Sequence, residues 1–171
     1  MSVTLLGRSS PVELVVPLAT EHGQTVFQIR PGVVDAEARE LYQWGYCHLL
    51  ACAIHETTGW SFGSVEGTTR PAGRWRWIHM GVFTPSGAFL DVVGARPVAA
   101  LSTTLAFRPD PMRVQHLSTF ADFCRTVGLA VDTPLSWWHS QLGEVGTRVT
   151  RTFAEHLLAA LPAAEFGEVA A

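Results

Sequence analysis

Two stretches of the sequence decide the predicted fold: YCHLLA at residues 46–51 and HMGVFTPSGAFLD at residues 79–91. The first places Cys47 at the start of an apolar helix, and the second places His79 and Asp91 on the two arms of a β-hairpin. A thiol, an imidazole and a carboxylate are the groups of a cysteine nucleophile, its base and the residue that orients the base. We therefore expect the two stretches to meet and to form a candidate catalytic site.

The hairpin is predicted from two alternating segments, residues 74–83 and 88–93, which Pro85-Ser86-Gly87 separates. Proline presets the first angle of a turn, and glycine accepts the left-handed backbone conformation that such a turn requires. Alternation with a period of two also places both tryptophans of the first segment on the same strand face as His79.

The three-residue loop sets the register of this hairpin. An odd-length connection pairs Thr84 with Ala88 and Gly81 with Asp91. His79 then lies diagonally from Asp91, with roughly 7 to 8 Å between their backbones, close enough for the side chains to hydrogen-bond. We expect Asp91 to select the tautomer of His79 and to stabilise its imidazolium form.

The position of Cys47 favours ionisation of its thiol, because a helix N-terminus presents partial positive charge and stabilises a thiolate. Cys52 lies deeper in the same helix and Cys124 falls in a core-facing pattern, so both are interpreted as structural. Cys47 can also be interpreted as a small buried apolar residue. Three cysteines cannot all pair within one molecule, which argues against a disulfide framework.

The segments before the central helix are readily interpreted. Residues 11–19 and 25–30 predict two strands of a hairpin. Asp35 is the predicted N-cap of a helix over residues 36–44. The cysteine-bearing helix is apolar over most of its circumference and is expected to end at Gly59, so it is predicted to be the buried central helix.

Beyond the central helix the patterns are mixed. Residues 61–73 are rich in Gly, Ser and Thr and predict an exposed loop. The remaining predictions are a short helix or strand within residues 97–105, a break at residues 108–111, a helix within residues 117–127 that Ser118 or Thr119 opens, helices over residues 136–142 and 147–161, and a frayed tail from Pro162.

Composition limits the class of protein. The 171 residues are 47% hydrophobic, which suits a single domain over residues 1–171 with residues 162–171 as its frayed tail. A net charge of -3 lacks the basic excess of a nucleic-acid-binding protein, so no nucleic acid partner is expected. No segment has the apolar pattern of a signal peptide or a membrane span, so we expect no membrane partner and a cytoplasmic location, with specialised export left open.

Over about residues 35–95 the sequence resembles the NlpC/P60-type branch of the papain-like cysteine hydrolases. The likeness consists of a cysteine that begins a core helix and the pattern HxGVFxxxGxFLD on a hairpin. It implies an α+β papain-like fold, with the cysteine-bearing helix packed on a small antiparallel sheet, and assigns Cys47 as nucleophile, His79 as base and Asp91 as orienting residue. The Asp-Cys-Ser-Gly common in that family is replaced here by Tyr-Cys-His-Leu, which leaves room for papain-like toxin, deamidase or acyltransferase relatives.

The predicted reaction is attack of the Cys47 thiolate on an amide or thioester carbonyl, giving an acyl-enzyme that water or an amine resolves. The substrate would be a peptide, a protein or another amide or acyl compound, and no cofactor is required. The backbone N–H of Cys47 is the expected first donor of an oxyanion hole, with Gln43 or Tyr46 as the second. His48 and Trp77 are further candidates for contact with the substrate.

Three alternatives remain open. His48, Cys52 and His55 fall on one stripe of the central helix and have the chemistry of zinc ligands. The RWRW run at residues 74–77 interleaves cations and aromatic rings, as in proteins that bind single-stranded nucleic acid, although a strand points the two types to opposite faces. The third alternative is a catalytically inactive papain-like binding module, in which the thiol is sealed from solvent or is out of reach of the histidine.

Overall fold

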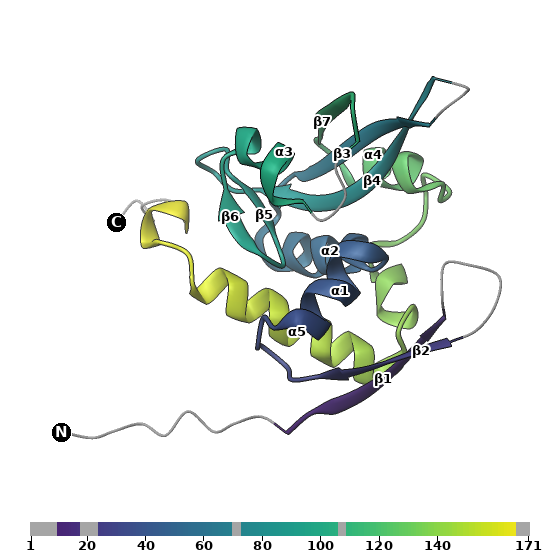
Figure 1. Cartoon of the computed structure of the whole chain (residues 1–171), viewed down its shortest axis with the longest axis vertical. Helices are drawn as coiled ribbons and strands as arrows, with labels where there is room; N and C mark the ends of the chain where they lie inside the picture. The colour runs from purple at the N-terminus through teal and green to yellow at the C-terminus, as the bar shows by residue number, and fades with distance from the viewer. Residues whose placement is uncertain (1–9, 18–23, 70–72, 106–108, 167–171) are drawn as a thin grey trace.

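A five-stranded antiparallel sheet forms the upper part of the fold in the view of Figure 1. The computed structural model describes residues 10–17, 24–69, 73–105 and 109–166. They form a mixed α+β structure, in agreement with the class predicted from the sequence. The strands are arranged in the order β6-β5-β4-β3-β7, with the bounds β3 Phe62–Thr69, β4 Arg74–Phe83, β5 Phe89–Asp91, β6 Gly94–Arg96 and β7 Met112–Leu117.

The helix that begins at Cys47 is the central helix, as predicted. This helix, α2, packs against β4 on one side and against α1 and α5 on the other (Figure 1). A separate two-stranded sheet, β1 (Val12–Pro17) with β2 (Gln24–Ile29), lies against α1. The helices are α1 Ala36–Trp44, α2 Cys47–Thr58, α3 Leu101–Thr104, α4 Phe120–Val127 and α5 Gly143–Ala159, and the 3-10 turns are η1 Val98–Ala100, η2 Leu135–Ser140 and η3 Ala163–Phe166.

Local signals in the first part of the chain produce the expected boundaries. The Asp35 side chain accepts a hydrogen bond of 3.0 Å from the backbone N–H of Ala38 and begins α1. Helix α2 ends at Gly59, whose φ of 70° is left-handed and whose N–H donates to the carbonyl of His55 at 2.7 Å. The two predicted N-terminal strands pair antiparallel.

The register of the β4–β5 hairpin is the predicted one. Gly87 has a φ of 84° and donates its N–H to the carbonyl of Thr84 at 2.8 Å, while the N–H of Thr84 donates to the carbonyl of Ala88 at 2.9 Å. Val82 pairs with Leu90 in the same register. One step further along the two strands, this register places Gly81 opposite Asp91.

A β-bulge in β4 interrupts the strict alternation that was expected before His79. Val65 of β3 opposes His79 and the next residue, Glu66, opposes Trp77, so Ile78 is an extra residue without a partner. Trp77 packs against the core beneath the sheet, whereas Ile78 packs with the cluster on the opposite face. The prediction that Trp77 and His79 share one face by simple alternation therefore does not hold across the bulge.

The prediction of an exposed loop over residues 61–73 is wrong. Residues 62–69 form β3, which pairs with both β4 and β7 and is buried over most of its length. The glycines that indicated a loop instead permit close packing. A Cβ on Gly63 would come within 2.7 Å of the Phe89 ring, and a Cβ on Gly67 would come within 2.4 Å of the Pro109 ring. Residues 70–72 lie outside the described part of the chain.

Sequence reasoning missed two strands in the second half of the chain, β6 and β7. Helix α4 begins at Phe120 within the predicted span of residues 117–127. Its N-cap is Thr119, one of the two residues predicted to open the helix, in a capping box with Asp122. Helix α5 begins at Gly143, four residues before the predicted start. The segment predicted as a helix from residue 136 is the 3-10 turn η2.

The first part of the predicted frayed tail is ordered. Residues 163–166 form η3, and the Glu165 carboxylate accepts a hydrogen bond from the hydroxyl of Ser86 at 2.6 Å and one from its N–H at 3.2 Å. This contact joins the tail to the β4–β5 turn. Residues 167–171 lie outside the described part of the chain.

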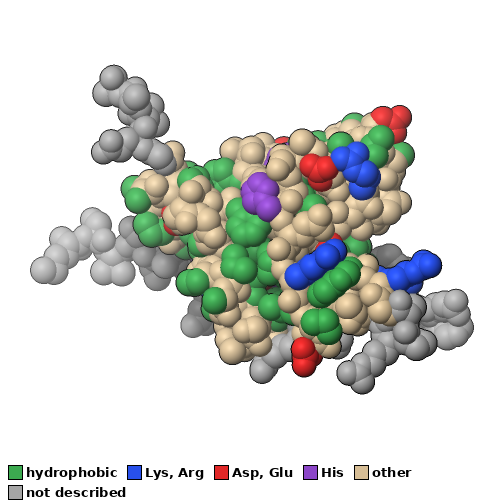
Figure 2. Space-filling view, turned by 90° about the horizontal axis from the view of Figure 1, so that it is seen from above, with side chains coloured by type: hydrophobic (Ala, Val, Ile, Leu, Met, Phe, Trp, Pro, Cys, Tyr) green, Lys and Arg blue, Asp and Glu red, His purple; other side chains and the backbone are tan. Residues whose placement is uncertain are grey.

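The sheet has apolar side chains on both faces. The face toward α2 contributes to the main core through Phe62, Met80, Val82, Leu90, Val92 and Leu117. The other face carries a smaller cluster of Val65 and Phe89 with Leu101 and Leu105. Figure 2 shows hydrophobic side chains across the upper side of the molecule. Within the described residues, none of the helices has the length and apolar character needed to cross a bilayer.

Candidate active site

Cys47 occupies the first position of α2, where backbone amides lack helical acceptors. Tyr46 precedes it as the N-cap residue and offers no side-chain cap to the helix. The carbonyl of Tyr46 accepts hydrogen bonds from the N–H groups of Leu49 and Leu50. The N–H groups of Cys47 and His48, one turn earlier, have no acceptor within the helix. The thiol therefore lies in the partial positive charge of a helix N-terminus.

His79 and Asp91 are brought together as the register predicted. The ring nitrogen Nε2 of His79 donates to Oδ2 of Asp91 at 2.7 Å. Both side chains are buried, with 3% of His79 and 2% of Asp91 exposed. Because Nε2 is bound to Asp91, Nδ1 is the ring nitrogen left for the thiol.

Electrostatic coupling joins His79 to Cys47. Burial raises the pKa of the Cys47 thiol, but the charges and hydrogen-bonding capacity of His79 and His48 outweigh burial and lower it to about 6. Burial lowers the pKa of His79, but the Cys47 thiolate and Asp91 outweigh burial and raise it to about 9. At neutral pH this favours a thiolate–imidazolium pair. The Nδ1 atoms of both histidines are buried without a well-aligned hydrogen bond, so the coupling is that of close charges.

Among the three cysteines, the thiol at the start of α2 is the one whose pKa is lowered. Burial raises the pKa of Cys52 well above its ordinary value, with the nearby Cys124 and Glu56 adding to the effect. Burial also raises the pKa of Cys124. This contrast agrees with the structural role expected for those two residues.

Arg96 is a fourth member of the site, and sequence reasoning missed it. Its guanidinium binds both oxygens of Asp91, with Nη1 at 2.6 Å from Oδ1 and Nη2 at 2.7 Å from Oδ2. A signal was available in the sequence. The run DVVGAR at residues 91–96 contains a two-residue turn followed by Gly94, which pairs with Asp91 and places Arg96 diagonally from it on β6.

His48 lies in an aromatic cluster beside the thiol. Its ring is 6.4 Å from that of Tyr46, 5.7 Å from that of Trp77 and 6.1 Å from that of Trp137, centre to centre. All four side chains are partly exposed. Three of the sequence candidates, Tyr46, His48 and Trp77, are thus neighbours of one another next to Cys47. Gln43 is partly exposed on α1, and its role as an oxyanion donor stays a prediction.

The alternative zinc site of His48, Cys52 and His55 does not form. His55 is turned to the carbonyl of Trp60, with its Nδ1 at 2.6 Å, whereas Cys52 is fully buried in the core and His48 lies in the aromatic cluster. Within the described residues, no group of three or more His, Cys, Asp or Glu side chains is placed to hold a metal ion.

The thiol has little direct access to solvent. Only 3% of the Cys47 surface is exposed. A groove of about 580 Å³ is lined by Trp75, Arg76 and Trp77 of β4 together with Glu66 and residues 125–128. Trp77 therefore lines this groove and also contacts the His48 ring.

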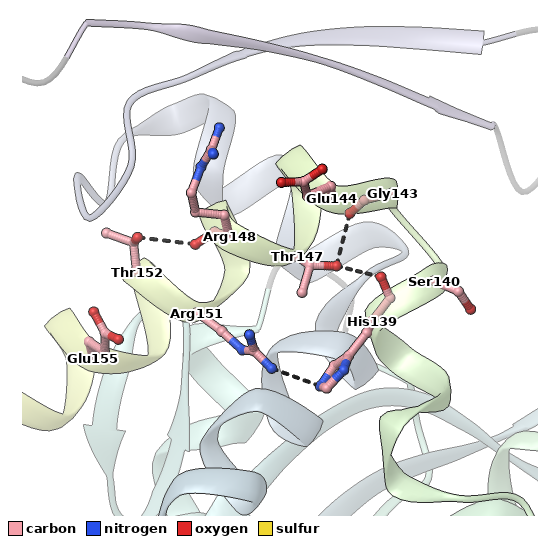
Figure 3. Close-up of a pocket in the computed structure, with 9 residues that line it drawn as sticks. All are labelled: His139, Ser140, Gly143, Glu144, Thr147, Arg148, Arg151, Thr152 and Glu155. Carbon is pink, nitrogen blue, oxygen red and sulfur yellow. Dashed lines mark hydrogen bonds between the residues drawn. The ribbon is translucent and has the colours of Figure 1, made fainter.

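A second groove, of about 880 Å³, lies on the outer side of α5 and η2, as Figure 3 shows. Arg151 and His139 approach each other in it at 3.0 Å, and both contact the carboxylate of Glu56. Thr147 donates to the carbonyls of His139 and Gly143. The groove contains none of the residues of the Cys47 site.

Comparison with protein-family models, with curated proteins and with solved structures gave no match. The function must therefore be inferred from the geometry of the site.

Proposed function

We propose that the protein is a papain-like cysteine hydrolase or acyltransferase that uses Cys47, His79 and Asp91 as a catalytic triad. The observation that carries the proposal is the His79–Asp91 hydrogen bond of 2.7 Å combined with the lowered pKa of the Cys47 thiol at a helix N-terminus. A merely structural cysteine has no need of a buried imidazole–carboxylate pair beside it. The order of elements, a cysteine-bearing helix followed by a histidine hairpin, also supports the resemblance to NlpC/P60-type enzymes.

In the proposed reaction, the Cys47 thiolate attacks the carbonyl carbon of an amide or thioester and forms a new C–S bond. The backbone N–H groups of Cys47 and His48 are the expected donors to the resulting oxyanion. The His79 imidazolium then transfers its proton to the leaving amine or thiolate as the original bond breaks. In the second half, neutral His79 removes a proton from water or an amine, which attacks the acyl-enzyme and releases the thiolate.

The remaining side chains have supporting roles in this proposal. Asp91 holds the imidazole with Nε2–H toward itself, which directs Nδ1 to the reacting groups. His48 stabilises the thiolate from a second direction. Tyr46, Trp77 and Trp137 surround His48 and would contact the acyl group or its neighbour. Because the thiol is nearly buried, substrate entry requires displacement of side chains in this cluster.

The burial of Cys47 also favours a second candidate function, a papain-like module that binds a partner without catalysis. The two candidates differ in what they predict for the thiol. An enzyme requires the thiol to react with an electrophilic acyl donor, and a binding module does not.

Turnover of a panel of peptide amides and acyl thioesters distinguishes the two. Wild-type protein should release amine or thiol, whereas the Cys47→Ala and His79→Gln variants should not. Cys52→Ala, a matched substitution of another buried cysteine in α2, should retain activity if the variant folds. Equal rates for wild type and Cys47→Ala would exclude the triad. A slow rate in wild type that also persists in the variant would favour the binding module.

A further inference from the structure

Four ionisable side chains of the site form a continuous row across the molecule. The hairpin registers of β4, β5 and β6 place His79, Asp91 and Arg96 as successive diagonal neighbours on adjacent strands. Cys47, at the N-terminus of α2, interacts electrostatically with His79 and extends the row beyond it. All four residues are largely shielded from solvent, with 10% of the Arg96 side chain exposed and less of the other three.

The charges in this row alternate in sign. A thiolate on Cys47 is followed by the imidazolium of His79, the carboxylate of Asp91 and the guanidinium of Arg96, so the row as a whole is neutral. Burying an uncompensated charge is costly, and a buried group commonly changes its protonation state to avoid this cost. The number of negative charges that the row holds therefore depends on the number of positive charges beside them.

We propose that Arg96 is a positioning residue that keeps the resting Cys47 in its thiolate form by neutralising Asp91. This inference rests on the proposed function, because it assigns Arg96 a role in preparing the same nucleophile. Without Arg96, a row of thiolate, imidazolium and carboxylate would carry a net charge of minus one. Protonation of the thiolate restores neutrality while the His79–Asp91 ion pair survives, so the thiol form becomes the resting state.

The geometry around Arg96 suits this role. Its two terminal nitrogens bind the two oxygens of Asp91 in a fork, and its Nε donates to the hydroxyl of Thr104 at 2.8 Å. The backbone N–H of Val93 donates to Oδ1 of Asp91 at 2.9 Å. Besides the bond from His79, Asp91 thus accepts three hydrogen bonds from two groups, and of these two groups the guanidinium is the one that brings a compensating charge. Burial raises the pKa of Asp91, but the hydrogen bonds and charges of Arg96 and His79 outweigh burial, lower the pKa to about 2 and keep the carboxylate ionised.

The test is a pH titration of the thiolate by its ultraviolet absorbance, taken as the difference between each protein and the same protein with Cys47→Ser. Arg96→Met should raise the pH at which the Cys47 thiolate forms by about one unit or more, a tenfold or greater loss of thiolate on the acid side of the transition. Arg96→Lys keeps the charge and should retain the thiolate, while losing the fork that orients Asp91. Thr104→Val removes a hydrogen bond from Arg96 without removing its charge and should leave the titration unchanged.

A double variant tests the charge argument even if Arg96→Met fails to fold. Asp91→Asn combined with Arg96→Met removes one negative and one positive charge, so the row is again neutral with a thiolate present. The thiolate should therefore form at a lower pH than in Arg96→Met, or at a pH near that of wild type if the single variant cannot be prepared.

The proposal would be overturned if the Cys47 thiolate of Arg96→Met formed at the same pH as in the wild type. It would also be overturned if Cys47 of the double variant stayed protonated at neutral pH. The titration needs no substrate, so it separates the two inferences. A protein that responds as described but catalyses no acyl transfer would retain the role of Arg96 and lose the proposed function.

Discussion

Removal of the His79 imidazole by the substitution His79→Gln should convert Cys47 from a thiolate to a thiol at neutral pH. In the wild-type site, burial raises the thiol pKa, and both histidines together more than reverse this, so that the pKa falls from 9.0 to about 6. The charge of His79 is the largest of the effects that lower the thiol pKa, and the hydrogen-bonding capacity of His48 comes next, ahead of that of His79, while the charge of His48 is the smallest. Loss of His79 therefore removes more than half of the total stabilisation of the thiolate.

The size of this effect follows from the same balance. The thiol pKa falls overall from 9.0 to about 6. The two histidines lower it by more than this difference, because they also overcome the rise that burial causes. Loss of more than half of the stabilisation by the two histidines should raise the pKa of the Cys47 thiol from about 6 to about 8 or higher. This change corresponds to a loss of about 3 kcal/mol in the free energy that favours the thiolate. At pH 7 the thiolate fraction should fall from about nine-tenths to about one-tenth or less.

The assay is the pH dependence of alkylation at Cys47, followed by mass spectrometry of the peptide that contains it. The matched control is His156→Gln, which changes an exposed histidine on α5 away from the site. The control should alkylate with the wild-type pH profile. A folded His79→Gln variant whose Cys47 still titrates near pH 6 would show that His79 does not couple to the thiol and would refute the reasoning.

Three further predictions address the same site. First, Asp91→Asn should lower kcat/KM by about 100-fold or more in a steady-state assay, because the orienting carboxylate is lost and Arg96 is left unpaired; an unchanged value would remove Asp91 from the mechanism. Second, Gly81→Ala should lower the free energy of unfolding in urea by about 1–3 kcal/mol, because its Cβ would come within 2.5 Å of the Leu90 carbonyl oxygen; a neutral effect would contradict the packing. Third, kcat/KM should decline below about pH 6, as the Cys47 thiolate is protonated, and above about pH 9, as the imidazolium loses its proton; a profile that is flat from pH 5 to 10 would contradict the ion pair.

The contributions of Cys47 and His79 to the free energy of unfolding should also depend on pH, with opposite signs for the two residues. The folded pKa of Cys47 is lowered, so its contribution is present above its ordinary value of 9.0 and is lost as the pH falls through about 6. The folded pKa of His79 is raised, so its contribution is present below 6.5 and is lost as the pH rises through about 9. The difference in unfolding free energy between wild type and His79→Gln, measured across this range, should therefore shrink above about pH 9.

The parts of the fold that could be predicted from the sequence are those specified by local chemistry. Asp35 and Gly59 determine helix ends through hydrogen bonds within a few residues. The turn at residues 85–87 determines the register of the hairpin through its odd length and its glycine, and that register brings His79 to Asp91. No information from distant parts of the chain is needed for these features.

The parts that could not be predicted depend on contacts between distant segments. Strand β3 contains glycines and small polar residues typical of a loop, and they are favoured in a strand only because Phe89 and Pro109 pack closely against them. The bulge at Ile78 likewise depends on the pairing of β4 with β3, which the β4 sequence alone does not reveal. Arg96 is an exception, because it lies five residues from Asp91 and was missed only because the short strand that carries it, β6, was not predicted.

The measurement that tests the central claim most directly is the mass of the intact protein after brief incubation with acyl thioesters and acid quenching, with peptide mapping of any adduct. A catalytic triad predicts one added acyl group, located on Cys47, and its absence from His79→Gln under the same conditions. A protein that gains no acyl group from any donor, or that acquires it on Cys52 and Cys124 as readily as on Cys47, would contradict the assignment of Cys47 as the nucleophile.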